Sequence, residues 1–553
     1  MKKILVLLLA VCMTLTTVGC NNENQEDYGD KLVLNVFNYN GGFGTDWLYE
    51  AAERFEELYK DEVFAEGYKG VKIVPDPVKS ASATLQDSIL SSADDVFFTE
   101  IFLAKRYYDQ NALLDISDIV NEPLTKYGES KSIADKMYEE DKTYYSYNGN
   151  YYGIPHYEGY MGISYNIDIF EKELCYFKQG GGFITSLSDT KASGPDGKAG
   201  TYDDGLPATM DQFIELCARL KGKGISPISW AGDCQFYFTR FLSSLWANEA
   251  GADNIKLMYS MDGQASGIAT EVDSNGTPKF LNPQPYIDNT NGYLVQTHIG
   301  KYYALDLAEK IIDNGYYSAN TFGETQTNLM AQADMLYSDF DPEDEISEKI
   351  AMYVDGNYWY NEAKLTFEEM EEYYGESASM KNRRFAYMPF PHAKAEDVGK
   401  KNVLVDDLNS VGMIKANIEP YKIKAAKAFL QFCYTDKSLQ EFTTITGAMK
   451  GVKYELTSSQ ISSMNSFYQS VHNVRQNSDV VKTVSDNSIF FNNAEGFFFG
   501  DYMSTKVKDK TPYNVPSKAM KDSNVSAIDY YNGMKYKYTK SDWISRYQQY
   551  FVD

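Results

Sequence analysis

The first twenty residues constrain this chain more than any other segment. Met1-Lys2-Lys3 gives a short positive start, an apolar stretch runs from Ile4 to Leu15, and Thr17-Val18-Gly19-Cys20 closes it. The apolar stretch is too short for a hydrocarbon core, which needs roughly 20 residues. The order of positive charge, apolar run and small residues is typical of a secretory leader. We therefore expect residues 1–19 to be a signal peptide that is removed.

Cys20 directly follows a small residue, Gly19, and precedes a polar run. This junction resembles the lipobox of bacterial lipoproteins, in which the cysteine is diacylated and becomes the new N-terminus, although Thr17 stands where that family usually has Leu. Two acyl chains suffice for stable anchoring. The resemblance implies that Cys20 anchors the protein to the extracellular face of the cell membrane and that residues 20–30 form a flexible tether. Ordinary secretion with cleavage nearby is the alternative.

Composition limits the partners of the main body. The formal net charge of −26 repels phosphate backbones, so nucleic acid is excluded as a partner. A hydrophobic content of 43% and an aromatic content of 15% indicate a folded protein. Because 553 residues exceed what one core accommodates, we expect two or more domains.

The cysteines and histidines give no sign of a metal centre. Four cysteines follow the anchor, and none forms a C-x-x-C pair or lies near a histidine at zinc-ligand spacing: Cys175, Cys217, Cys234 and Cys433. Free thiols and one disulfide are both compatible with this pattern. The four histidines are scattered along the chain.

A parallel sheet is indicated near the N-terminus. Residues 32–37 form an apolar run typical of a buried strand, and a helix with one apolar face is expected from Thr45. Further strands are expected at 71–74 and 96–98. Strand, helix and strand in this order predict parallel pairing, so ligands should gather at the loops beyond the strand ends, Asn38 to Gly44 and Thr99-Glu100.

Five segments, in a fixed order along the chain, carry a family resemblance. They are Asp94 to Phe97, Asn111 to Ile116, Tyr152 to Phe170, Ala351 to Trp359, and Ala425 to Gly447. The third contains Gly153-Ile154-Pro155 and Tyr165-Asn166 followed by Phe170. Together the segments resemble the extracellular solute-binding proteins of sugar-importing ABC transporters, the maltose-binding-protein-like family.

This resemblance implies an α/β fold of the two-lobed, type II periplasmic-binding-protein kind. Each lobe would hold a mainly parallel sheet flanked by helices, with a ligand cleft between the lobes. The implied boundaries are 31–160 plus 392–447 for lobe 1, and 165–388 plus 452–553 for lobe 2. Three crossings would lie near Tyr160 to Ser164, Met388 to His392, and Gly447 to Gly451.

The resemblance also implies a function. The chain would be a monomeric binding protein without catalytic activity or a required cofactor. It would capture a carbohydrate, expected to be an oligosaccharide, and deliver it to ABC permease subunits. Two alternatives stay open at this point. A secreted glycan-active enzyme needs only two carboxylates, and the chain has 78 Asp and Glu. An adhesin or signalling lipoprotein could keep the same fold.

Six residues at the family's loop positions are candidate ligand contacts. A sugar ring presents C–H patches on its faces and hydroxyls at its rim, so aromatic rings beside carboxylates and amides satisfy both. Residues of these types are Asn40, Glu100, Tyr157, Glu158, Trp230 and Trp359. For each tryptophan a core position is the alternative, and it is the more common one.

One acidic loop is a candidate calcium site. Residues 194–205 contain four glycines and three carboxylates, Asp196, Asp203 and Asp204. Calcium prefers oxygen ligands on a backbone that can curl around it. The spacing differs from that of an EF-hand, and a metal-free surface turn is the favoured alternative.

Overall fold

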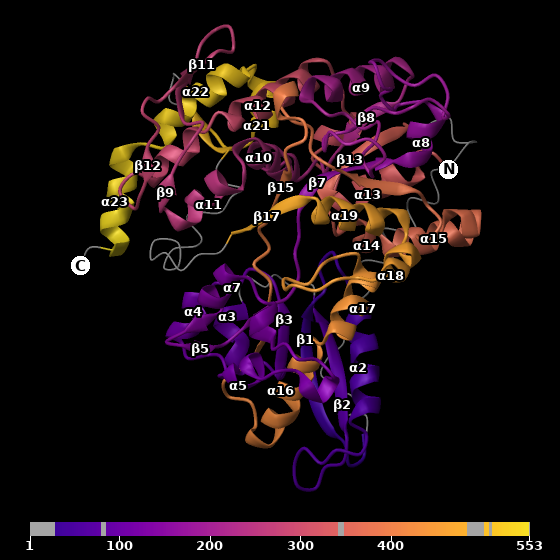
Figure 1. The fold of residues 1–553 in the computed structure, drawn as a ribbon, viewed down its shortest axis with the longest axis vertical. Coiled ribbons are helices and arrows are strands. Elements are labelled where there is room, and N and C mark those ends of the chain that lie inside the picture. Colours follow the sequence, from indigo (N-terminus) through magenta and orange to yellow (C-terminus); the bar gives the residue numbers. More distant parts are fainter. Residues whose placement is uncertain (1–27, 79–84, 341–347, 484–502, 508–510, 552–553) are drawn as a thin grey trace.

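The chain folds into two α/β lobes arranged along the long axis of the molecule (Figure 1). The computed structural model describes residues 28–78, 85–340, 348–483, 503–507 and 511–551. The predicted signal peptide, Cys20 and most of the tether lie outside these ranges. Within them, no helix combines the length and apolarity of a membrane-spanning segment.

Lobe 1 is built on a five-stranded sheet. Its strand order is β2 (Val71–Val78), β1 (Leu32–Tyr39), β3 (Val96–Thr99), β16 (Val411–Ile414) and β6 (Ile154–Pro155). The pairings β1–β2 and β1–β3 are parallel, as the sequence predicts, and β16 runs antiparallel to β3 and β6. The carboxyl ends of β1 and β3 therefore meet at the same edge of the sheet, which faces lobe 2.

Helix α2 (Asp46–Leu58) follows β1 and covers the lobe 1 sheet. Its buried positions include Trp47, Ala51 and Phe55, which form the single apolar face that the sequence predicts. Thr45 occupies the N-cap position, but its side chain makes no capping hydrogen bond.

Lobe 2 contains a four-stranded sheet ordered β14 (Phe385–Met388), β7 (Met161–Asn166), β13 (Ile350–Gly356) and β8 (Ser226–Ser229). The pairing of β13 with β8 is parallel, whereas β7 is antiparallel to both β13 and β14. The sheet is therefore mixed, not mainly parallel. Helix α10 (Phe236–Ala250) contacts this sheet through β7 and β13 and is mostly buried.

The second crossing lies later in the chain than the predicted one near Met388 to His392. Strand β15 (Asn402–Asp406) pairs in parallel with β17 (Ser478–Lys482). The side-chain amide of Asn402 donates to Oδ1 of Asn248 in α10 at 2.8 Å. These contacts hold β15 in lobe 2, so the chain enters lobe 1 between Asp406 and Val411. Residues 392–406 therefore belong to lobe 2.

The other two crossings run close to the expected places. One joins β6 to β7, and the other follows α17 (Asp436–Thr446), a helix that packs on α2 in lobe 1. This third segment leads through α18 (Ser458–Ser463) to α19 (Ser466–Gln476), which packs on β14 in lobe 2.

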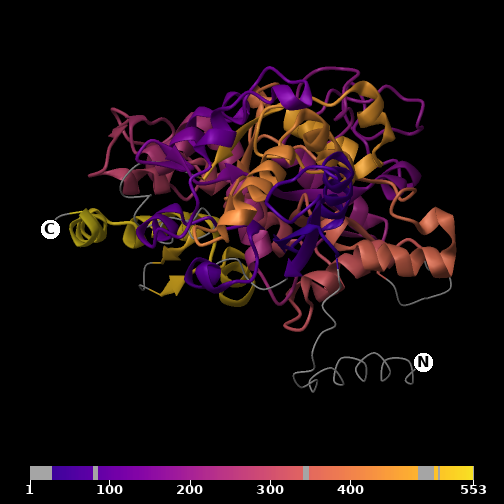
Figure 2. The same ribbon diagram turned by 90° about the horizontal axis from the view of Figure 1, so that it is seen from below.

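The C-terminal helices complete lobe 2. Helices α21 (Pro516–Ser523) and α22 (Ala527–Lys537) pack on α12 (Gly300–Asp313), and Figure 2 shows this yellow part of the chain at one side of the molecule. The four cysteines of the body are free thiols, which decides between the two alternatives for Cys175, Cys217, Cys234 and Cys433.

Candidate functional site

The loop after β1 in lobe 1 touches the segment after β13 in lobe 2. The side-chain amide of Asn361 donates to the Phe43 carbonyl at 2.6 Å. Gly42 approaches Tyr358 so closely that a Cβ at position 42 would lie 2.4 Å from the Tyr358 Cβ. The side chains considered below lie around this meeting of the lobes.

Tyr157 and Glu100 form the lobe 1 side of the site. The Tyr157 hydroxyl donates to Oε1 of Glu100 at 2.6 Å. Burial raises the pKa of Glu100 to about 7, against the opposing influence of the Tyr157 hydrogen bond and of Arg240. Tyr157 is itself held by Ser410, whose Oγ accepts from its backbone N–H at 2.7 Å. Glu100 directly follows β3 and is half-buried, as a ligand contact at a strand end should be.

Arg240 and Asp407 form the lobe 2 side. Arg240 lies in α10, and Asp407 lies in the second crossing segment. Nε of Arg240 donates to Oδ2 of Asp407 at 3.0 Å, and a second contact joins Nη2 to Oδ1. Two parallel contacts fix a guanidinium more firmly than one. Both side chains keep some exposed surface, 16% and 14%, so their outer edges remain available to a ligand.

Aromatic rings accompany these charges. Phe236, in the first turn of α10, is 44% exposed, and the Arg240 guanidinium lies 5.9 Å from its ring centre. The Phe43 ring lies 4.8 Å from that of Tyr157 and 5.9 Å from that of Tyr358. Tyr358 is half-buried. The site therefore offers apolar ring surface beside charged groups.

Two further carboxyl groups, those of Asp355 and Glu362, act electrostatically on Tyr358. Burial, followed by repulsion from Glu362, raises the pKa of Asp355 to about 7. Asp355 accepts a hydrogen bond from the Tyr353 hydroxyl at 2.8 Å, and Glu362 accepts one from the Gln332 amide at 2.6 Å. Glu362 also contributes to raising the pKa of Glu100, which places the two carboxyls in one electrostatic environment.

This arrangement suits a polyhydroxylated ligand. Carboxyl, guanidinium and phenol groups can each exchange hydrogen bonds with hydroxyls at a ring edge, while aromatic faces cover C–H patches. Asn40, half-buried in the loop after β1, lies at the same edge of lobe 1. Three sequence-predicted residues are thus at the meeting of the lobes: Asn40, Glu100 and Tyr157.

Trp230 is a core residue, which corrects its prediction as a ligand contact. Its side chain is fully buried, and its indole stacks on Phe238 with ring centres 4.2 Å apart. Nε1 donates to Oε1 of Gln235 at 2.9 Å. The indole therefore has no exposed face on which a sugar could stack.

Trp359 requires the same correction. It is fully buried, and Nε1 donates to Oγ of Ser164 in β7 at 2.8 Å. Four aromatic rings approach it edge-on at 5.3 to 5.7 Å: Tyr353, Tyr360, Phe385 and Phe467. Its place at one of the family's loop positions, the basis of the prediction, does not distinguish a core side chain from a cleft side chain.

Glu158 is committed to an internal ion pair. It is fully buried, and its two oxygens accept from Nε and Nη2 of Arg475 at 3.0 and 3.1 Å. The Tyr160 hydroxyl also donates to Oε2. Because Glu158 is fully buried and both of its oxygens are engaged, the predicted ligand role is corrected to a structural one.

The acidic loop gives no support to a calcium site. Its carboxylates accept hydrogen bonds from the loop itself: Asp196 from Lys198 N–H at 2.7 Å, Asp203 from Asp196 N–H at 2.8 Å, and Asp204 from Gly200 N–H at 2.8 Å. Among the described residues, no three His, Cys, Asp or Glu side chains are grouped so as to hold a metal ion. These hydrogen bonds describe the loop as a turn, and the calcium site stays a prediction.

Sequence reasoning missed several residues of this site. They are Phe236, Arg240, Tyr358, Glu362 and Asp407. Phe236 to Arg240 begin the helix that follows the Trp230 loop. The sequence therefore indicates a segment next to the ligand contacts, but Trp230 itself is the wrong side chain. A helix that starts just beyond a strand end places its first-turn side chains at that end of the sheet, and this signal was present in the sequence.

The fold and the site define a class: a two-lobed binding protein whose polar and aromatic contacts lie between the lobes. Residues 45–440 match the family described as bacterial extracellular solute-binding proteins. This match spans most of the chain, and the chain therefore belongs to that family. None of the curated proteins matches its sequence significantly.

Solved structures agree with the two-lobed fold. A chitin oligosaccharide binding protein is 15% identical, with a TM-score of 0.53 over 94% of this chain and 100% of the other. The GacH receptor of Streptomyces glaucescens is 11% identical, with a TM-score of 0.52 over 94% and 99%. BlMnBP1, a binding protein of an ABC transporter from Bifidobacterium animalis subsp. lactis in complex with mannobiose, is 15% identical, with a TM-score of 0.51 over 93% and 95%. At these identities the similarity concerns the fold.

Proposed function

We propose that this protein captures an oligosaccharide between its lobes and delivers it to the permease subunits of an ABC transporter. The observation that carries the proposal is that the Tyr157–Glu100 hydrogen bond of lobe 1 and the Arg240–Asp407 ion pair of lobe 2 share one electrostatic environment, beside the exposed ring of Phe236. Similar two-lobed structures include a chitin oligosaccharide binding protein and a binding protein in complex with mannobiose, which supports a saccharide ligand.

An oligosaccharide fits the charge pattern of the site. Arg240 is already paired with Asp407, and the half-buried Glu100 and Glu362 add acidic groups nearby. Hydroxyls can donate to these carboxyl groups without bringing a charge of their own. Binding across both lobes would also exclude water from the polar contacts and strengthen them.

The test is a calorimetric titration of the purified protein against a panel of neutral oligosaccharides. Binding of one class in the micromolar range or tighter supports the proposal, and its loss in an Arg240→Ala variant would assign the site. Failure of every saccharide to bind, or binding that Arg240→Ala leaves unchanged, would contradict it. Release of shortened products from a bound glycan would favour a glycan-active enzyme instead.

We further propose that Cys20 is diacylated and holds the protein at the extracellular face of the membrane. The leader ends at this cysteine, and a polar run begins directly after it. Labelling with a fatty-acid analogue tests the anchor: a Cys20→Ala protein should lose the label and leave the membrane fraction. Equal labelling of both proteins would overturn the proposal.

A further inference from the structure

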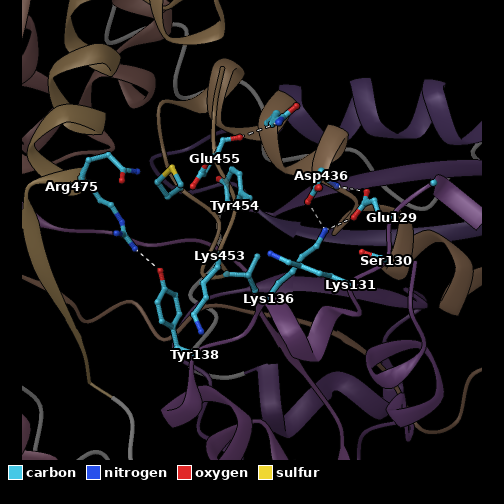
Figure 3. Close-up of a pocket in the computed structure, with 15 residues that line it drawn as sticks. Glu129, Ser130, Lys131, Lys136, Tyr138, Asp436, Lys453, Tyr454, Glu455 and Arg475 are labelled. Atoms are coloured by element: carbon cyan, nitrogen blue, oxygen red, sulfur yellow. Dashed lines mark hydrogen bonds and ion pairs between the residues drawn. The ribbon is translucent and has the colours of Figure 1, made fainter. Parts of the chain in front are cut away.

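A polar pocket, of about 720 Å³, opens between the lobes near the third crossing. Its walls come from residues 128–138 and α17 of lobe 1, from residues 449–455 of the crossing, and from the end of α19 in lobe 2. The volume lies in the range of small-molecule sites. Figure 3 shows Arg475 and Tyr138 on one side of the pocket and Lys136 toward the other.

This pocket is separate from the site described above. The two regions meet at Tyr157 and Glu158, which are adjacent in the chain. Tyr157 contacts Glu100 in the site described above, whereas Glu158 binds Arg475 in the pocket wall. Successive side chains of an extended segment point to opposite sides. The two sites therefore use opposite sides of the first crossing, and none of the lining residues of the pocket belongs to the proposed saccharide site.

Most charged side chains around the pocket neutralise one another. Nζ of Lys136 lies 2.6 Å from Oε2 of Glu129 and 2.7 Å from Oδ1 of Asp436. Arg475 binds Glu158 and also donates to the Tyr138 hydroxyl at 2.8 Å. Lys136 lies between two carboxylates and Arg475 binds one, so these groups fix the walls and together carry one excess negative charge.

Lys131 and Lys453 differ from the paired charges of the pocket. Both are exposed in the pocket lining, and neither has a carboxylate within salt-bridge distance in the part of the chain that the structure describes. The Lys453 ammonium lies 5.0 Å from the ring centre of Tyr138, and its backbone N–H donates to the Lys136 carbonyl at 2.7 Å. Glu455 is the remaining lining carboxylate, and Figure 3 places it beyond Tyr454, away from Lys453.

We propose that this pocket binds a small anionic molecule, through a carboxylate or phosphate group held by Lys131 and Lys453. Two ammonium groups in one pocket attract a single anion more strongly than either does alone, because their potentials add. Lysine binds such groups as a flexible point charge, so the two side chains can converge on one oxyanion. Hydroxyl and peptide groups of the walls would supply the neutral hydrogen bonds.

The test uses two probes at constant ionic strength, inorganic phosphate and glucuronate, each titrated calorimetrically into the full-length mature protein. Binding of either probe at one site per chain supports the proposal. Binding of phosphate alone identifies a phosphate group, and binding of glucuronate alone identifies an acidic sugar. A Lys131→Gln/Lys453→Gln double variant should bind the active probe at least about tenfold more weakly, a loss of about 1.4 kcal/mol.

Lys381→Gln is the matched control, because Lys381 is an exposed lysine outside the pocket lining. It should bind the probe as the parent does. The double variant should keep the parent's melting temperature and saccharide affinity, which separates this proposal from the proposed function. Absence of binding by both probes, or equal weakening in Lys381→Gln and in the double variant, would overturn the anion site.

Discussion

Tyr157 and Glu158 are adjacent in the chain and connect two different regions of the molecule. The Tyr157 hydroxyl donates to Glu100 of lobe 1 at 2.6 Å, while the Glu158 carboxylate binds Arg475 of lobe 2, with Nε 3.0 Å from Oε2. The first crossing therefore positions one ligand-facing carboxyl group and one structural ion pair. Substitutions at the two positions should separate ligand binding from stability.

Tyr157→Phe should weaken saccharide binding with little loss of stability. The variant keeps the ring and removes the hydroxyl that orients Glu100 and lowers its pKa. The pKa of Glu100 should therefore rise further above 7, and its carboxyl group should be less well fixed. We expect a loss of about 1 kcal/mol in binding, measured by calorimetry. Tyr373→Phe is the control, since Tyr373 is 74% exposed; an equal loss there would contradict the assignment.

Phe236→Ala and Trp230→Ala should have opposite effects. Phe236 is 44% exposed, so its loss should reduce affinity by about 2 kcal/mol, as for a stacking contact, and barely change the melting temperature. Trp230 is fully buried, so its loss should cost about 3 to 5 kcal/mol of unfolding free energy. Melting curves and titrations of both variants decide the matter. A normal melting temperature for Trp230→Ala would show that the indole is not core.

The sequence predicts the lobe 1 half of the site better than the lobe 2 half. Asn40 and Glu100 follow strands of a parallel sheet, and parallel strands place their carboxyl ends together, so local pattern suffices there. Arg240 and Asp407 are 167 residues apart, and nothing in either segment indicates the other. Their pairing arises because α10 packs beside β15 in lobe 2.

The misplaced second crossing has a similar cause. Strand β15 belongs to lobe 2 because it pairs with β17. Strand β17 lies after the third crossing, and no local pattern around β15 indicates a pairing with so distant a segment.

The prediction for the two tryptophans is wrong for a different reason. Both tryptophans follow a strand of lobe 2, but local sequence does not say whether an indole turns toward the core or toward the other lobe.

Arg475→Met should destabilise the protein strongly. The variant leaves the fully buried Glu158 carboxylate without its cation, and breaking one side of a buried pair costs about 3 to 5 kcal/mol. The double variant Arg475→Met/Glu158→Gln removes the stranded charge and should recover much of this loss. Urea unfolding of the parent, both single variants and the double variant completes the cycle. Additive losses would contradict a direct coupling between the two side chains.

Lys450 should make stability depend on pH above neutrality. Its ammonium group is buried in lobe 1 among four aromatic rings, 4.5 Å from the ring centre of Trp47 and 4.6 Å from that of Phe442, and it lies 2.8 Å from Nδ1 of His156. Burial lowers the pKa of Lys450 to about 7. Between about pH 10 and pH 7 the unfolded chain then binds a proton that the folded chain lacks, so stability falls as the pH is lowered through this window.

Lys450→Met tests this account with an apolar side chain of similar length. The variant loses the hydrogen bond to His156. Burial holds the pKa of His156 well below its usual value, so its ring stays neutral and this cost is the same from pH 10 to pH 7. The variant also has no buried amine at this position, so its stability lacks the fall between pH 10 and pH 7 that Lys450 causes in the parent. The unfolding free energy of the variant relative to the parent should therefore improve as the pH falls from 10 to 7, by an amount on the order of 1 to 4 kcal/mol. Lys381→Met, at an exposed position, should show no such trend. A difference between Lys450→Met and the parent that stays constant from pH 10 to pH 7 would show that Lys450 does not titrate there.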